Sequence, residues 1–186
     1  MSAGPAAFNG PVQLRPATLD DVPALAANVS EAFQGYRSFA PPGWEPPPAE
    51  RELQYLRERL AEPHTWCLVA DVGGAIAGHV AFFDAVVARR PESERGLAHF
   101  YQLFVRPDHQ GSGVAKALMA AAVAAARERG FLTMRLFTPA LQARARRFYE
   151  REGWVVSGEP EPHPDMGLDI VEYRLTVPRA DPAGEA

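Results

Sequence analysis

The sequence has a single cysteine, Cys67, among its 186 residues. An internal disulfide is therefore impossible, and so is a metal site built from several cysteines. Lysine is almost missing too: Lys116 stands alone among 19 basic residues, and the formal net charge is -4. The chain thus has no general basic surface, and we expect no nucleic-acid partner. Because the five histidines show no metal-ligand spacing, we also expect no metal.

Long apolar runs are absent as well. No segment reaches the roughly 18 apolar residues that a membrane-spanning helix needs, and the opening residues have neither a basic leader nor a signal-like apolar stretch. We therefore expect a cytoplasmic protein with no membrane partner. With 47% hydrophobic and 23% charged residues, the composition is typical of a folded protein with a sizeable core.

The length suits one compact domain. Residues 1–10 and 178–186 are rich in proline, glycine and alanine and carry no periodic apolar pattern, so we expect two flexible ends. The predicted folded domain spans residues 11–177.

Apolar periodicity predicts the order β-α-α-β-β-β-α-β-α-β-β. The expected strands are Val12–Arg15, Thr65–Asp71, Ala75–Val87, Leu97–Val105, Leu132–Phe137, Trp154–Ser157 and a last one from Val171 to Val177. The expected helices follow Thr18, follow the proline-rich segment 41–48, begin at Gly113, and run through Leu141. A further acidic, proline-rich segment, 159–165, reads as a stiff loop. The fold class is mixed α/β, with a strand-helix-strand unit that favours parallel pairing.

The segment LFVRPDHQGSGVA, residues 103–115, runs from a predicted strand through a glycine-bearing loop into a long helix. The first amides of a helix have no partner within it and carry the positive end of its dipole, so such a loop can cradle a pyrophosphate. Gly111 and Gly113 remove side chains that would block close approach, and the small Ala115 keeps the first turn open.

Two other phosphate-binding patterns fit this loop poorly. A P-loop needs lysine followed by serine or threonine after its second glycine, but Lys116 stands five residues past Gly111 and is followed by Ala117. The dinucleotide fingerprint needs a glycine where Lys116 stands, and it opens a Rossmann half, whereas here three meander strands come first.

The segment resembles the GNAT superfamily of acyl-CoA-dependent N-acyltransferases. The superfamily pattern is Gln or Arg, two residues, Gly, one residue, then Gly or Ala, and residues 110–115, QGSGVA, fit it. Residues 145–154, ARRFYEREGW, are similar to the second conserved segment, and the element order agrees from about Val12 to Val177. The resemblance implies a single-domain mixed sheet whose central parallel strands splay apart.

The resemblance also implies acetyl-CoA as acyl donor. Its pyrophosphate would lie on the amides of Gln110, Gly111, Ser112, Gly113, Val114 and Ala115, and its pantetheine arm would pair with Leu103, Phe104 and Val105. Lys116 is a candidate for the 3′-phosphate, and Gln142 stands where many members have an asparagine that contacts the arm. A main-chain amide near Phe104 or Val105 would stabilise the oxyanion.

Two side chains are candidates for proton transfer. His99 occupies the position where many relatives have a glutamate base, and a neutral histidine can deprotonate an amine; the alternative is a histidine that only lines the cleft. Tyr149 matches the tyrosine that often protonates the leaving thiolate, and its alternative is a core residue. Cys67 could carry an acyl group, but it reads better as core filler.

The acceptor side is expected to be aromatic. By analogy with the family, Phe33, Tyr36, Phe39 and Trp44 lie near the amine, with Tyr101 on the same strand face as His99; ordinary packing is the alternative reading. The sequence therefore predicts acetyl transfer from acetyl-CoA to the primary amine of a small-molecule acceptor by direct attack. The alternatives are a non-catalytic acyl-CoA sensor, a protein N-acetyltransferase and a nucleotide-binding module. Many relatives form homodimers.

Overall fold

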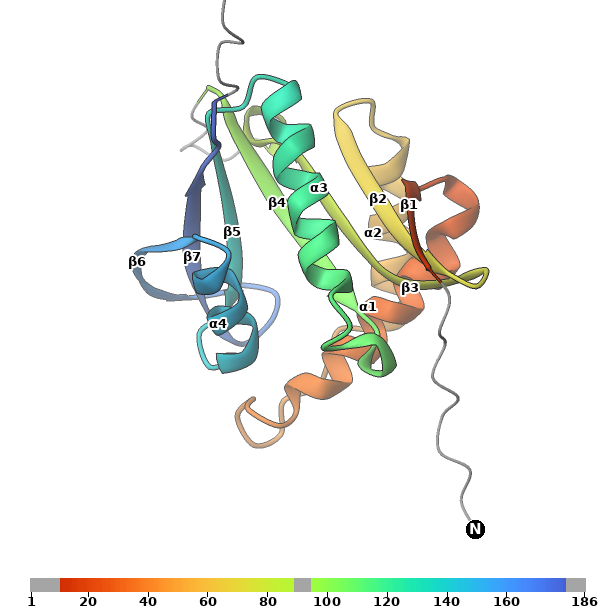
Figure 1. The fold of residues 1–186 in the computed structure, drawn as a ribbon. Coiled ribbons are helices and arrows are strands. Elements are labelled where there is room, and N and C mark those ends of the chain that lie inside the picture. Colours follow the sequence, from red (N-terminus) through yellow and green to blue (C-terminus); the bar gives the residue numbers. More distant parts are fainter. Residues whose placement is uncertain (1–10, 89–94, 180–186) are drawn as a thin grey trace, which may run out of the picture. The chain divides into compact units, whose positions relative to one another are not determined.

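The computed structural model describes residues 11–88 and 95–179 (Figure 1). The strands are β1 (Val12–Pro16), β2 (Thr65–Val72), β3 (Ala75–Asp84), β4 (Leu97–Val105), β5 (Thr133–Pro139), β6 (Val155–Pro162) and β7 (Asp169–Thr176). The helices are α1 (Val22–Tyr36), α2 (Ala49–Ala61), α3 (Val114–Glu128) and α4 (Ala143–Arg151), with 3-10 turns η1 (Leu19–Asp21), η2 (Ala85–Ala88) and η3 (Pro107–His109). This is a single mixed α/β domain with the predicted order of strands and α-helices.

The strands form one seven-stranded sheet in the order β1-β2-β3-β4-β5-β7-β6. β4 and β5 run parallel, as predicted for strands joined through a helix, whereas β1–β2, β5–β7 and β6–β7 are antiparallel pairs. The parallel ladder joins only Leu97–His99 to Thr133–Arg135. The last residues of β4, 100–105, lie beyond this ladder, as expected of a splayed pair.

The chain divides into two compact units, and β3 and β4 pass from one to the other. Among the described residues, the first unit comprises 11–81 and Gln102–Met119, and the second comprises 82–88, 95–101 and 120–179.

In the first unit, α1 forms as its periodicity predicts. The buried face carries the five predicted residues and Tyr36: Val22, Leu25, Ala26, Val29, Phe33 and Tyr36. The turn before it is closed by the Thr18 N–H, which donates to Asp21 Oδ2 at 2.8 Å. α1 packs against α2, and α2 packs against β2.

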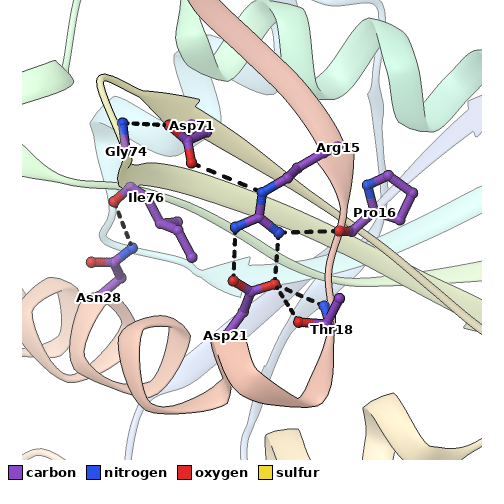
Figure 2. A network of polar contacts seen from close by, with 8 residues as sticks. All are labelled: Arg15, Pro16, Thr18, Asp21, Asn28, Asp71, Gly74 and Ile76. Carbon is purple, nitrogen blue, oxygen red and sulfur yellow. Dashed lines mark hydrogen bonds and ion pairs between the residues drawn. The ribbon is translucent and has the colours of Figure 1, made fainter.

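The β1 edge is fastened by a polar network around Arg15 (Figure 2). Arg15 Nη1 and Nη2 each donate to one oxygen of Asp21 at 2.8 Å, and Arg15 Nε lies 3.9 Å from Asp71 Oδ2. Asp71 Oδ1 also accepts the Gly74 N–H at 2.8 Å, in the predicted Gly73-Gly74 hairpin turn. Both glycines have positive φ, 63° and 85°, which a two-residue hairpin of this type requires.

In the second unit, β7 lies between β5 and β6, and α4 packs on β7. Its core includes Phe100, Met134, Leu136, Trp154 and Tyr173, each no more than 2% exposed. The predicted glycine cap of α3 forms in this unit: Gly130 has φ 78°, and the Phe131 N–H donates to Ala126 O at 3.0 Å.

Several predicted boundaries are wrong. β3 ends at Asp84 rather than Val87, because Asp84 Oδ1 accepts the Val86 N–H at 3.0 Å and turns the chain into η2. Leu141 is 67% exposed and precedes α4 instead of packing within it. The first part of the expected acidic loop, 159–162, belongs to β6, where a register shift between Ser157 and Glu161 accommodates it.

Candidate active site

The loop between β4 and α3 is folded on itself by short-range hydrogen bonds. Arg106 pairs with Asp108 at 2.8 Å, and Ser112 Oγ donates to His109 O at 2.6 Å. Gln110 Nε2 donates to Val105 O at 3.3 Å, so the loop is tied back to the end of β4. These bonds are local in sequence, and the start of the segment is also tied to β3, where Ala77 O accepts the Arg106 N–H at 2.9 Å.

The loop presents a set of unsatisfied main-chain amides. Within the described chain, the first bond leading into α3 runs from Ala117 N–H to Gly113 O, and no acceptor faces the N–H groups of Gly111, Gly113, Val114, Ala115 and Lys116. Gly111 and Gly113 have φ of 86° and 92°, and a Cβ built on either meets nothing within 4 Å. Amides at the positive end of a helix dipole, open to solvent, form a site suited to a phosphate group.

The side chains around these amides differ in how exposed they are. Ser112 and Lys116 are exposed, and Lys116 lies in the first turn of α3, where its ammonium can reach a bound phosphate. Val114 is buried as a whole residue, whereas Gly111, Ser112 and Gly113 just before it are exposed. Gln142 begins α4 in the second unit, where Thr138 Oγ1 donates to its Oε1 at 3.1 Å.

His99 and Tyr101 lie together in the second unit. The His99 ring is 5.1 Å from Phe83 and 5.8 Å from Phe137, and the Tyr101 ring is 5.2 Å from Phe83. Both residues are half-buried and alternate with buried Ala98 and Phe100, which confirms that they share a strand face.

Arg135 was not singled out from the sequence. It is 1% exposed, stands in register with His99 across the parallel ladder, and places its guanidinium 5.8 Å from the Phe137 ring. Arg135 is thus a buried cation on the neighbouring strand, and its guanidinium and the His99 ring each lie 5.8 Å from the Phe137 ring. A strand pattern alone gives no sign of it, because arginine is usually exposed.

Tyr149 is 8% exposed and lies in an aromatic group on α4. Its ring is 5.6 Å from Phe148, 6.1 Å from Trp154 and 6.0 Å from Tyr173. The Tyr173 hydroxyl donates to Glu150 Oε1 at 2.8 Å and accepts from Arg146 Nε at 3.0 Å, which fixes α4 on β7. The helix that carries Tyr149 is thus held on both sides of that residue.

The predicted acceptor aromatics form one cluster in the first unit. The Tyr36 ring lies 5.2 Å from Phe33, 5.1 Å from Phe39 and 6.2 Å from Trp44. Arg37 and Glu45 form an ion pair that fastens the proline-rich segment to the end of α1. Phe33 and Tyr36 are buried, whereas Trp44 is half-buried. Phe39 is half-buried too, so the rim of this cluster that a substrate could touch is Phe39 and Trp44.

The end of β4 in the first unit carries a pair that sequence reasoning missed. His79 on β3 is fully buried, and its Nε2 lies 3.2 Å from Gln102 Oε1. Burial lowers the pKa of His79 to about 4, so the ring is neutral at physiological pH. Its ring is 5.7 Å from Phe104, whose other neighbour is Phe33 at 6.0 Å. The sequence does carry a sign of this pair, because Gln102 is a polar residue within the largely apolar segment Leu97–Val105.

Cys67 is not suited to nucleophilic chemistry. It is buried on β2, and burial raises the pKa of its thiol to about 12. The thiolate is therefore scarce at neutral pH, and the core-filler reading holds.

Within residues 11–88 and 95–179, no three His, Cys, Asp or Glu side chains come together in a way that could hold a metal ion. None of the helices in these ranges combines the length and apolar character needed to cross a membrane.

Comparisons with known proteins identify the family. Residues 29–154 match the model of the acetyltransferase (GNAT) family. N-acetyltransferase family 8 member 2 of Rattus norvegicus is 33% identical over 132 residues, which are 69% of this chain and 57% of that protein. The chain thus spans little more than half the length of that relative.

Solved structures are similar over almost the whole chain. A protein of Desulfovibrio desulfuricans assigned to the GNAT family is 25% identical, with a TM-score of 0.69 over 90% of this chain and 100% of that one. The yncA protein of Salmonella typhimurium, solved with its cofactor acetyl-CoA, is 20% identical, with a TM-score of 0.70 over 95% of this chain and 100% of that one. The family model covers more than half of the sequence and includes the loop with the unsatisfied amides. The chain belongs to the GNAT family of acetyltransferases.

Proposed function

We propose that this protein transfers the acetyl group of acetyl-CoA to the primary amine of a small molecule by direct attack. The observation that carries the proposal is the row of main-chain amides at Gly111 and residues 113–116, for which no acceptor is recorded within the described chain, with open space beside Gly111 and Gly113. Free amides at the start of a helix can bind a pyrophosphate. The family match and the acetyl-CoA of the Salmonella protein support the choice of donor.

In the proposed reaction the amine nitrogen forms a bond to the thioester carbon, and the carbonyl oxygen takes up negative charge. The carbon–sulfur bond then breaks, and the electron pair leaves with the sulfur of coenzyme A. His99 takes the proton that the amine loses, and Tyr149 gives a proton to the thiolate. A main-chain amide at the end of β4 stabilises the oxyanion.

An unprotonated amine is needed for attack, and an alkylamine with a pKa of about 10.4 is mostly charged at neutral pH. The task of the base is therefore to remove a proton from the amine. His99 is half-buried beside Phe83 and Phe137, and a histidine that acts as a base must be in its neutral form.

The amide cradle is tested by a charge placed where the pyrophosphate would lie. Gly111→Asp adds a carboxylate at an open position, and Gly111→Asn adds a side chain of nearly the same shape without charge. Both residues tolerate positive φ better than most. Calorimetry should show a much larger loss of acetyl-CoA affinity for the aspartate variant. Equal affinities in the two variants would contradict the cradle.

Turnover is tested by following thiol release from acetyl-CoA with a panel of amino acids, polyamines, amine-bearing antibiotics and peptides. We expect release with at least one small amine. Binding of acetyl-CoA without release would indicate a sensor, and release with peptides alone would indicate a protein N-acetyltransferase. Tighter binding of ATP or NAD than of acetyl-CoA would indicate a nucleotide-binding module.

A further inference from the structure

β3 lies unusually close to the end of β4 at Gly78. A Cβ built on Gly78 would stand 2.6 Å from Phe104 O, 3.0 Å from Val105 Cγ2 and 3.2 Å from Val105 Cα. Real Cβ atoms essentially never approach a carbonyl oxygen so closely. The Phe104 carbonyl therefore occupies the space that any side chain at position 78 would need.

This contact fixes the direction of one amide. The peptide between Phe104 and Val105 is trans, so its C=O and N–H point in opposite directions. Because the Phe104 carbonyl points at Gly78, the Val105 N–H points away from Gly78. The next residue is anchored as well, since Arg106 N–H donates to Ala77 O at 2.9 Å.

On the opposite face of β3, His79 contacts side chains of the same stretch of β4. His79 follows Gly78 directly, so its side chain points to the other face of the strand. There its Nε2 meets Gln102 Oε1 at 3.2 Å, and its ring meets Phe104 at 5.7 Å. All three groups are in the first unit, and His79 and Gln102 are buried.

We propose that Gly78 and His79 are positioning residues for the oxyanion: they orient the Phe104–Val105 peptide so that the Val105 N–H, rather than that of Phe104, donates to the thioester oxygen. This inference rests on the proposed acetyl transfer and assigns its donor amide. Gly78 provides the room for the carbonyl, and the His79–Gln102 bond keeps β4 from shifting along β3.

The first test is Gly78→Ala. The added methyl group must displace the Phe104 carbonyl and so rotate the Val105 N–H, and loss or misplacement of one such donor lowers kcat by about 100-fold or more. The Kd for coenzyme A, which has no thioester oxygen, should stay near the wild-type value. Gly35→Ala is the matched control, because a Cβ there meets nothing within 4 Å and the φ of Gly35 is not positive.

The second test remains decisive if Gly78→Ala does not fold. His79→Leu keeps the bulk but removes the bond to Gln102, and it should lower kcat by about tenfold with an unchanged Kd for coenzyme A. His79→Gln can again donate to Gln102 Oε1 and should recover most of the loss. A merely structural role would change melting temperature without this recovery of kcat.

A spectroscopic measurement separates this inference from the proposed function. In wild type, the 1H–15N resonance of the Val105 amide should differ between the acetyl-CoA and coenzyme A complexes; in the variants this difference should shrink. Acetyl transfer by wild type together with unchanged kcat in Gly78→Ala or His79→Leu overturns the inference alone. If wild type does not bind acetyl-CoA, the proposed function fails, and the inference falls with it.

Discussion

Arg15 and Asp21 form a two-pronged ion pair in which each terminal guanidinium nitrogen lies 2.8 Å from one carboxylate oxygen (Figure 2). The pair joins the edge strand β1 to the turn that starts α1. The hydrogen bonds from Arg15 are the main cause that lowers the pKa of Asp21 to about 2. The free energy of unfolding should therefore decrease when the pH falls far enough to protonate Asp21.

A carboxyl group whose pKa is lowered by folding stabilises the protein above its unfolded pKa, which is about 3.9 for aspartate. This contribution is lost as pH falls from about 4 to about 2. Asp21→Asn should lower the free energy of unfolding by about 1–2 kcal/mol at pH 7, after allowance for solvent screening. Urea unfolding at pH 7 and at several values below 4 measures it. Asp20→Asn, in the same turn, is the control, and an equal loss there would contradict the prediction.

Lys116 is predicted to bind the 3′-phosphate. Lys116→Met keeps most of the side chain and removes the charge, so the Kd for coenzyme A should rise about tenfold, the value of one charge-assisted hydrogen bond. The Kd for dephospho-coenzyme A should not change. Titration calorimetry with both ligands checks this, and a parallel loss for the two would place the lysine elsewhere in the binding site.

Tyr149→Phe tests the proton donor. Removing the hydroxyl should lower kcat by about 100-fold, the usual contribution of a general acid, with little change in the Kd for acetyl-CoA. Tyr55→Phe on α2 is the control and should keep wild-type kcat. If Tyr149→Phe turns over normally, Tyr149 is only a member of the aromatic group around Trp154.

His99 is tested by the pH dependence of kcat/KM. A histidine that acts as a base must be neutral, so wild-type kcat/KM should fall on the acidic side, and His99→Gln should lose this limb together with most of its kcat. Added imidazole should restore part of the activity. If the fall of kcat/KM at acidic pH persists in the variant, His99 is not the base and only packs among its neighbours.

The end of β3 and the loop expected at 159–162 were predicted wrongly, each for a physical reason. Asp84 ended β3 because its carboxylate captured the Val86 amide, a local competition that apolar periodicity does not register. The expected loop at 159–162 became strand because β7 offers hydrogen-bonding partners to Glu161 and Pro162. In both cases hydrogen bonding, rather than the pattern of hydrophobic residues, decided where the strand ends.

The sequence alone determined the order of strands and helices, the buried face of α1 and the position of the amide loop. These follow from periodicity, glycine at positive φ and bonds between near neighbours, which are local properties of the chain. The structure alone disclosed the buried Arg135, the His79–Gln102 bond and the contact of Gly78 with the Phe104 carbonyl. The His79–Gln102 bond and the Gly78–Phe104 contact join β3 to β4, and Arg135 on β5 stands in register with His99 on β4. Only strand pairing brings such residues together.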